Sequence, residues 1–387
     1  STASQVNPDG GYTGFTPARF RHQVLQIAAQ MDLPTDRVIL GGDHIGPHPW
    51  RHEDAGHALR KASQLAAACV AAGYQKIHLD TTTPCANDPQ GPDGALPLDV
   101  ISTRAADLCR ATERVARNAG MVPPAYVIGS DVPLPGGSHM TVNTARVTDV
   151  GHVRDFVAAC RRAFQTAGLE AAWQRVLALV VHTGAEFSPV AVQAYDSERM
   201  QPLVAYMRLS KHLVLEAHST DFQTPDALAR MVTDHVGILK VGPALTYAMR
   251  EALFALAAIE KESLGGRKSI QCSDLPATLE GLMVADPGAW KPYYQGTEKE
   301  LVHLRRNAYS DRIRYYWACP AADAAVRRLM ANLKQHSPPL ALVMEHLPAI
   351  GEKLRDGILA NDPEHIVLDH IGEVTARYAR ACRPVSP

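Results

Sequence analysis

The sequence predicts an α/β fold built as a (β/α)8 barrel, and three observations lead to this prediction. Short apolar, β-branched runs alternate with segments of helical periodicity, which is the rhythm of a parallel α/β sheet. The runs are apolar enough to be buried on both faces, as parallel strands are. Nearly every run also carries ionisable residues at its carboxyl end, and in a barrel those ends meet at one mouth. A doubly wound sheet would gather them at a single switch point, so we favour the barrel.

Six runs qualify as strands, and helical segments separate them. The strands are expected at residues 37–44, 75–80, 125–131, 176–182, 212–218 and 237–242. Helices are expected at 20–31, 55–72, 102–118, 149–166, 193–211 and 225–234, most of them because apolar residues recur there at i, i+3 and i+4. A closed barrel needs eight strands, so this count leaves two unaccounted for.

Beyond residue 264 the alternation of strand and helix stops. Segments 321–335 and 365–380 have amphipathic helical patterns. We therefore expect a barrel domain over residues 1–264 and a helical extension over 265–387 that packs on it. The stretch 309–317 within the extension is dense in Arg and aromatic residues, which predicts a packing block at a subunit contact of a homo-oligomer.

Composition excludes several classes of protein. The 39 Lys and Arg residues nearly balance 40 Asp and Glu, which gives no electrostatic reason to expect nucleic acid as a partner. No apolar stretch approaches the roughly 18 residues of a membrane span. The seven cysteines are odd in number and scattered, which argues against a disulfide framework and favours a cytoplasmic location. No GxxxxGK[ST] motif occurs, so a P-loop kinase is not supported.

The sharpest candidate site is the segment GGDHIGP at 41–47. Its strand ends in Gly-Gly, which lets a ligand approach the backbone, and then presents a carboxylate and an imidazole side by side. This arrangement suits Asp43 as a general acid/base and His44 as a metal ligand. The alternative is an Asp that caps the next turn beside a surface His.

Two later strands repeat this pattern of acid and imidazole. His78 and Asp80 fall on one face of the strand at 75–80, because side chains alternate with a period of two. His78 fits an internal hydrogen-bond pair as well as a functional role, whereas Asp80 lies nearer the mouth and is a catalytic candidate. Glu216 and His218 share a face in the same way.

A divalent-metal site can be assembled from these strand ends. His44, His218 and either His182 or Glu186 would supply three ligands and leave open positions, as a catalytic metal requires. The sequence does not decide between His182 and Glu186.

Residues that follow the last two strands are candidates for binding and catalysis. Ser219 and Thr220 stand at a strand-to-helix turn, and Gly242 and Thr246 precede or open the next helix, where backbone N–H groups bind phosphate or hydroxyl groups. Lys240 lies inside a buried strand. A Schiff-base lysine is one interpretation, and the preferred one is an internal counter-ion for carboxylates such as Glu216 or Asp80.

Seven motifs together resemble one family. They are QVN at 5–7, GGYTG at 10–14, GGDHIGP at 41–47, KIHLD at 76–80, EAHSTD at 216–221, LKVGPALT at 239–246 and SDRIRYYW at 310–317. They resemble the GatZ/KbaZ family, the accessory subunits of class II D-tagatose-1,6-bisphosphate aldolase. That family is similar in turn to the zinc-dependent class II aldolases, which are (β/α)8 barrels.

The resemblance implies roles for several residues. Asp43 would be the acid/base, with His44 and His218 as zinc ligands and Glu186 as the best-placed middle ligand. The loops at 219–221, including Asp221, and at 242–246 would face phosphate or hydroxyl groups of the substrate. His182 stands where the family pattern has Gln, and Asp131 where it has Glu. Family members also have residues before the position that matches Ser1, so we expect the first two barrel strands to be absent from this chain.

Two functions follow from the resemblance. In the first, the protein binds a sugar phosphate and supports a catalytic class II aldolase partner. That partner cleaves tagatose 1,6-bisphosphate to dihydroxyacetone phosphate and glyceraldehyde 3-phosphate. In the second, the protein is itself a metal-dependent 4-epimerase of a ketose or ketose phosphate that works by retro-aldol chemistry.

Overall fold

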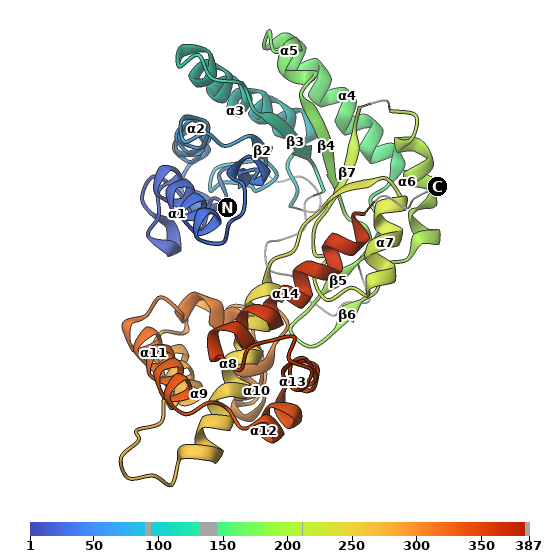
Figure 1. The fold of residues 1–387 in the computed structure, drawn as a ribbon. Helices are drawn as coiled ribbons and strands as arrows, with labels where there is room; N and C mark the ends of the chain where they lie inside the picture. Colours follow the sequence, from blue (N-terminus) through green and yellow to red (C-terminus); the bar gives the residue numbers. More distant parts are fainter. Residues whose placement is uncertain (90–93, 132–144, 211, 384–387) are drawn as a thin grey trace.

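A computed structural model describes residues 1–89, 94–131, 145–210 and 212–383, and its centre is a parallel sheet of six strands (Figure 1). The sheet order β1–β2–β3–β4–β7–β8 follows the chain. The strands are β1 (Gly41–Ile45), β2 (Lys76–Leu79), β3 (Ala125–Gly129), β4 (Val176–Val181), β7 (Val214–Ala217) and β8 (Val236–Leu239). Each of the six predicted strands is therefore confirmed.

The barrel itself is confirmed only in part, because the described sheet is a half-barrel. Six strands are fewer than the eight that close a barrel with a filled interior. Ser1 to Ala3 lie along the free edge of β1, with a parallel bridge between Thr2 and Asp43. The amino group of Ser1 donates to the Gly41 carbonyl oxygen at 2.8 Å, and the Asp43 amide donates to Ser1 at 2.8 Å.

Helices cover the outer face of the sheet. They are α1 (Pro17–Gln30), α2 (Ala55–Ala71), α3 (Leu98–Asn118), α4 (Val150–Thr166), α5 (Glu170–Trp173), α6 (Ser197–Met207) and α7 (Pro225–Thr233). The largest hydrophobic cluster joins α2, α3, α4, α6 and α7 to alternate strand residues such as Ile77, Leu79 and Leu215. The residues between them therefore face the inside of the half-barrel.

The helix predicted at 193–211 is shorter than expected. The side chain of Asp196 accepts hydrogen bonds from the amides of Glu198 and Arg199, so α6 begins only at Ser197. Val192–Gln193 forms a short strand, β6, which pairs antiparallel with β5 (Glu186–Phe187). Helical periodicity in the sequence thus extended across a hairpin that precedes the helix.

The C-terminal part of the chain is helical. It contains α8 (Pro243–Leu264), α9 (Leu275–Ala285), α10 (Glu298–Asn307), α11 (Pro320–Gln335), α12 (Leu340–His346), α13 (Pro348–Arg355) and α14 (Pro363–Ala381). A second hydrophobic cluster runs from Ala252 to Val367. α14 returns along α8 to contact α7, as Figure 1 shows. The domain boundary at residue 264 remains a prediction, and α8 belongs in part to both regions.

Among the described residues, no helix combines the length and the apolar character that crossing a membrane requires.

Candidate active site

A cavity of about 450 Å³ opens at the carboxyl ends of the strands. Three parts of the chain form its walls. The strand ends contribute Asp43, His44, His218 and Lys240, the N-terminal segment contributes residues 1–5, and the C-terminal part contributes Arg312 and Arg314. Three of the strand-end residues predicted from the sequence, Asp43, His44 and His218, therefore meet at one mouth.

The end of β1 is built to present two consecutive side chains to this cavity. In a regular strand Asp43 and His44 would point to opposite faces. The pairing of β1 with β2 is irregular between Gly42 and Ile45, and His44 has a φ of +47°, in the left-handed region. The next turn packs closely on β2, because a Cβ at Gly46 would lie 1.6 Å from the Asp80 carbonyl oxygen. Only glycine fits there.

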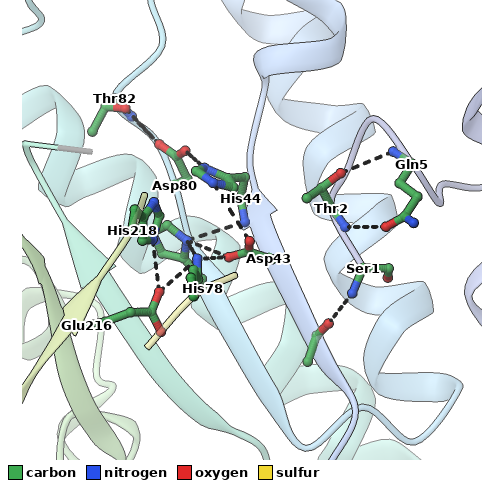
Figure 2. Close-up of polar contacts among 12 residues, drawn as sticks. Ser1, Thr2, Gln5, Asp43, His44, His78, Asp80, Thr82, Glu216 and His218 are labelled. Atoms are coloured by element: carbon green, nitrogen blue, oxygen red, sulfur yellow. Dashed lines mark hydrogen bonds and ion pairs between the residues drawn. The ribbon is translucent and has the colours of Figure 1, made fainter. Parts of the chain in front are cut away.

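Four buried or half-buried side chains at the strand ends gather into one cluster, as Figure 2 shows, and two of them also line the cavity. One ligand atom from each of Asp43, His78, Glu216 and His218 lies within 4.8 Å of the others. Two carboxylates and two imidazoles are donors that divalent metals accept, so this group could hold a metal ion. The set predicted from the sequence shares only His218 with it, since His44 and Glu186 lie outside the group of four.

Lys240 lies against this group. Its ammonium donates to Glu216 Oε1 at 2.8 Å and to Asp43 Oδ1, and it lies 3.4 Å from His78 Nδ1. The other oxygen of Glu216 accepts from Lys76 at 2.6 Å. These ion pairs agree with the counter-ion interpretation of Lys240. A metal that took the same oxygen atoms would have to displace the ammonium.

Electrostatics set the protonation of the group. Burial opposes ionisation of Glu216, but the hydrogen bond to His218 and the charge of Lys240 outweigh it and hold the pKa of the carboxyl far below its usual range. Burial and the charge of Lys240 lower the pKa of His218 to about 3. At neutral pH the carboxylate is therefore charged and the imidazole neutral, which is the state that metal ligation requires.

His44 is oriented by Asp80. Its Nδ1 lies 2.8 Å from Asp80 Oδ2, and the other oxygen of Asp80 accepts from the Thr82 hydroxyl at 2.7 Å. This leaves His44 Nε2 directed elsewhere, 3.7 Å from Asp43 Oδ2. A carboxylate on the far nitrogen is how metal-ligating histidines are held. His78 does not pair with Asp80; its Nδ1 lies 3.2 Å from Asp43 Oδ1 instead.

Glu186 and His182, the alternative middle ligands, lie near each other beyond this group. Glu186 Oε1 accepts from the Phe187 amide at 2.9 Å, and its Oε2 lies 3.6 Å from His182 Nε2. Burial raises the pKa of Glu186. The choice between His182 and Glu186 as the middle ligand therefore stays a prediction.

The two loops predicted to bind phosphate are tied to each other. Asp221 Oδ1 accepts from the amides of Gly242 and Ala244, both at 2.9 Å, at the start of α8. Thr220 donates to the Lys240 carbonyl oxygen at 2.6 Å, and Thr246 donates to the Pro243 carbonyl oxygen at 3.1 Å. A carboxylate of the protein thus already uses amides that a phosphate would otherwise take. Ser219 and Thr246 both line the cavity.

Sequence reasoning missed the contribution of Arg312 and Arg314 to the cavity. Part of the 309–317 block packs within this chain, since the guanidinium of Arg312 lies 3.2 Å from the centre of the Tyr293 ring, and the predicted subunit contact stays a prediction. Tyr315 also meets Tyr12 edge to face, with ring centres 5.0 Å apart. The density of arginines was the available signal, but nothing in the sequence indicated that this block reaches the strand ends.

Comparison with solved structures gives a match at well over 30% identity. The crystal structure of a probable tagatose 6 phosphate kinase from Sinorhizobium meliloti 1021 is 38% identical, with a TM-score of 0.89 over 98% of this chain and 92% of that chain. Fructose-bisphosphate aldolase from Campylobacter jejuni is 11% identical, with a TM-score of 0.38 over 89% of this chain and 78% of that one. The fructuronate-tagaturonate epimerase UxaE from Cohnella laeviribosi is 12% identical, with a TM-score of 0.36 over 84% and 67%.

A family model covers almost the whole chain. The model for the D-tagatose-1,6-bisphosphate aldolase subunit GatZ/KbaZ-like matches residues 1–383. The motifs that suggested this family therefore lie within one continuous match that includes both the half-barrel and the C-terminal helices. The chain belongs to the GatZ/KbaZ-like family of D-tagatose-1,6-bisphosphate aldolase subunits.

Proposed function

We propose that this protein is a cytoplasmic, sugar-phosphate-binding subunit of tagatose-1,6-bisphosphate aldolase. It supports a catalytic class II partner that cleaves the substrate to dihydroxyacetone phosphate and glyceraldehyde 3-phosphate. The cavity at the strand ends carries this proposal. Its volume of about 450 Å³ suits a small ligand, and its walls combine imidazoles with lysine and arginine, which suit a sugar bearing phosphate. All seven cysteines are free, which fits a reducing compartment.

A divalent metal, with zinc as the expected ion, belongs to this proposal. His44, His218 and Glu186 are its proposed ligands. The donor chemistry of the neighbouring group of Asp43, His78, Glu216 and His218 supports a metal in this region. When bound, such an ion would polarise the carbonyl and hydroxyl oxygens of a ketose. The loops at 219–221 and 242–246 are proposed to face polar groups of the sugar.

One observation favours a second function, ketose-phosphate 4-epimerisation. Asp43 and His44 both line the cavity, and Asp80 orients His44. A subunit that only stabilises a partner would not need this arrangement. In the reaction, Asp43 takes the proton of the C4 hydroxyl and the C3–C4 bond breaks. Its electron pair passes into a C2–C3 enediolate, and an aldehyde forms at C4. The bond then re-forms on the opposite face of the aldehyde, and Asp43 returns the proton to O4.

Asp43 can play this part only after a change of partners. Burial opposes its ionisation, but Lys240 and His44 hold its pKa well below the usual range, so it is a weak base while Lys240 is bound to it. The substrate hydroxyl must therefore replace the Lys240 ammonium at Asp43 Oδ1. This exchange would couple proton transfer to entry of the sugar.

The experiment that separates the two functions uses the purified protein with and without a class II aldolase partner. Metal content is measured by mass spectrometry, cleavage is assayed with tagatose 1,6-bisphosphate, and epimerisation is assayed with ketose phosphates. Activity only with the partner, retained in Asp43→Ala, supports the accessory subunit. Epimerisation by the protein alone, lost in Asp43→Ala and His44→Ala but not in Asp155→Ala, supports the second function. Asp155 is the matched control because it is exposed on α4.

Two outcomes would reject parts of this scheme. A metal-free protein in which His44→Ala behaves as wild type would reject the metal-dependent enzyme. Covalent trapping of substrate on Lys240 by borohydride would replace it with Schiff-base chemistry.

A further inference from the structure

The C-terminal wall of the cavity presents two arginines, Arg312 and Arg314, that form no ion pair within 4.0 Å among the described residues. Arg312 is only 5% exposed, yet among the described residues its guanidinium has a single hydrogen bond, from Nε to the Ala289 carbonyl oxygen. Its two terminal nitrogens have no hydrogen bond within that part of the chain. Arg314 donates to the carbonyl oxygens of Ser310 and Asp311 and, at 2.9 Å, to the Tyr315 hydroxyl. All of these acceptors are neutral.

The nearest acid of the same segment is engaged elsewhere. Asp311 pairs with Arg250 of α8, with Arg250 Nε and Asp311 Oδ1 3.1 Å apart. Arg312 instead packs on aromatic rings, with its guanidinium 3.2 Å from the centre of Tyr293 and 5.2 Å from that of Tyr315. A buried cation that lacks a counter-ion costs stability, so an arrangement of this kind fits a group that an anionic ligand completes.

The opposite wall offers no comparable group for an anion. Lys240 is paired with Asp43 and Glu216. The amides of Gly242 and Ala244 at the start of α8 donate to Asp221. Within the described lining of the cavity, the arginine pair therefore holds the positive charge that is not directly ion-paired, although the charge of Arg314 also opposes the burial that raises the pKa of the Asp221 and Asp311 carboxyls.

We propose that Arg312 and Arg314 are the phosphate anchor of this cavity and that they hold the phosphoryl group of a ketose phosphate. The proposal rests on the proposed function in one respect, which is that the ligand is a sugar phosphate. A planar guanidinium matches two phosphate oxygens at once, and the aromatic rings fix the plane of Arg312. The sugar carbons then extend toward the strand ends, where Asp43 and His44 line the same cavity. The C-terminal helices thereby select the phosphorylated substrate.

Calorimetric titration with D-tagatose, D-tagatose 6-phosphate and D-tagatose 1,6-bisphosphate tests this proposal. The wild type should bind both phosphates more tightly than the free sugar. Arg312→Met should weaken binding of the phosphates by about 10- to 100-fold, the range for charge-assisted hydrogen bonds, and leave binding of tagatose unchanged. Arg312→Lys should lose less affinity for the phosphates than Arg312→Met. Arg327→Met, an exposed arginine of α11 in the same region, should match the wild type.

Three results would overturn the proposal. Phosphate binding that is unchanged in both Arg312→Met and Arg314→Met would reject the anchor but leave sugar-phosphate binding intact. Equal weakening of tagatose and its phosphates would mean that Arg312 acts only on the shape of the cavity. A wild type that binds no phosphorylated ketose would reject the proposed function along with the anchor. Arg314→Met decides the matter should Arg312→Met fail to fold, and unfolding curves of each variant establish which have folded.

Discussion

The two walls of the cavity balance their charges in opposite ways. On the strand-end wall, Glu216 is fully buried and its oxygens bind Lys240 and Lys76. On the C-terminal wall, Arg312 and Arg314 donate only to neutral acceptors among the described residues. The first wall is complete without a ligand, whereas the second gains its counter-ion from one. In a chain with a formal net charge of -1, attraction for a sugar phosphate thus depends on local placement and not on the total charge.

The largest effect is expected from Glu216→Gln, which breaks the paired wall at its centre. The substitution leaves two lysines beside a neutral amide in a buried site, so the free energy of unfolding should fall by about 3 to 5 kcal/mol. Urea denaturation measures the change. The control is Glu53→Gln, because Glu53 and Lys61 form a half-buried ion pair at the surface, and the substitution should cost less than about 1 kcal/mol. Similar losses of unfolding free energy in the two variants would contradict the view that the strand-end wall balances its charges without a ligand.

A smaller effect, with a pH signature, is expected from Asp80→Asn. Burial opposes ionisation of Asp80, but the hydrogen bond with His44 outweighs it and holds the pKa of the carboxyl far below its usual range. A depressed carboxyl pKa stabilises the folded state above the unfolded value, and this stabilisation is lost as the pH falls below it. Asp80→Asn should therefore cost about 1 to 3 kcal/mol at pH 7. The difference in the free energy of unfolding between wild type and Asp80→Asn should be smaller at pH 3. A gap that widens in acid would refute this account.

Lys240→Met tests the strand-end wall directly, because it removes the cation that pairs with Asp43 and Glu216. Asp43 Oδ1 and Glu216 Oε1 would then be free to approach a divalent ion beside His218, which belongs both to the proposed ligand set and to the group of four. Affinity for zinc should therefore rise by about tenfold, or 1.4 kcal/mol. Titration calorimetry with zinc measures the shift. Lys61→Met is the control, since Lys61 is only half-buried and lies in another ion pair. If zinc affinity does not change, Lys240 and the metal do not share these oxygen atoms.

The smallest effect is expected from Arg312→Met in the absence of ligand. Its removal leaves no acid unpaired, and only a hydrogen bond to Ala289 and the stacking on Tyr293 are lost. The free energy of unfolding should change by no more than about 1 kcal/mol. Thermal unfolding without phosphate or sulfate provides the measurement. A loss comparable to that of Glu216→Gln would show that the second wall is also internally balanced.

The sequence was sufficient to predict the strands because buried parallel strands leave a local signal. Runs such as 176–182 are apolar on both faces, and polar residues at their ends mark the mouth. It also placed Asp43, His44 and His218 at one mouth, because the carboxyl ends of parallel strands converge.

Pairings between distant residues left no such signal. Asp80 contacts His44 of the neighbouring strand β1 and not His78 of its own strand. This pairing depends on the irregularity of β1, and a prediction based on regular strand alternation does not include that irregularity. The position of Arg312 depends on how the C-terminal helices fold back over the strand ends. The boundary between strand β6 and helix α6 was predicted wrongly for a related reason. The N-cap at Asp196 is a weaker signal in the sequence than the apolar periodicity on both sides of it.

Helix α8 connects the two walls of the cavity. It begins at Pro243, three residues after Lys240, and its 22 residues span about 33 Å. Arg250 on this helix binds Asp311, the residue next to Arg312. The separation between the lysine of one wall and the arginine of the other is thus fixed along a single rigid element. A change in the length or direction of α8 would therefore move the two charged walls of the cavity relative to each other.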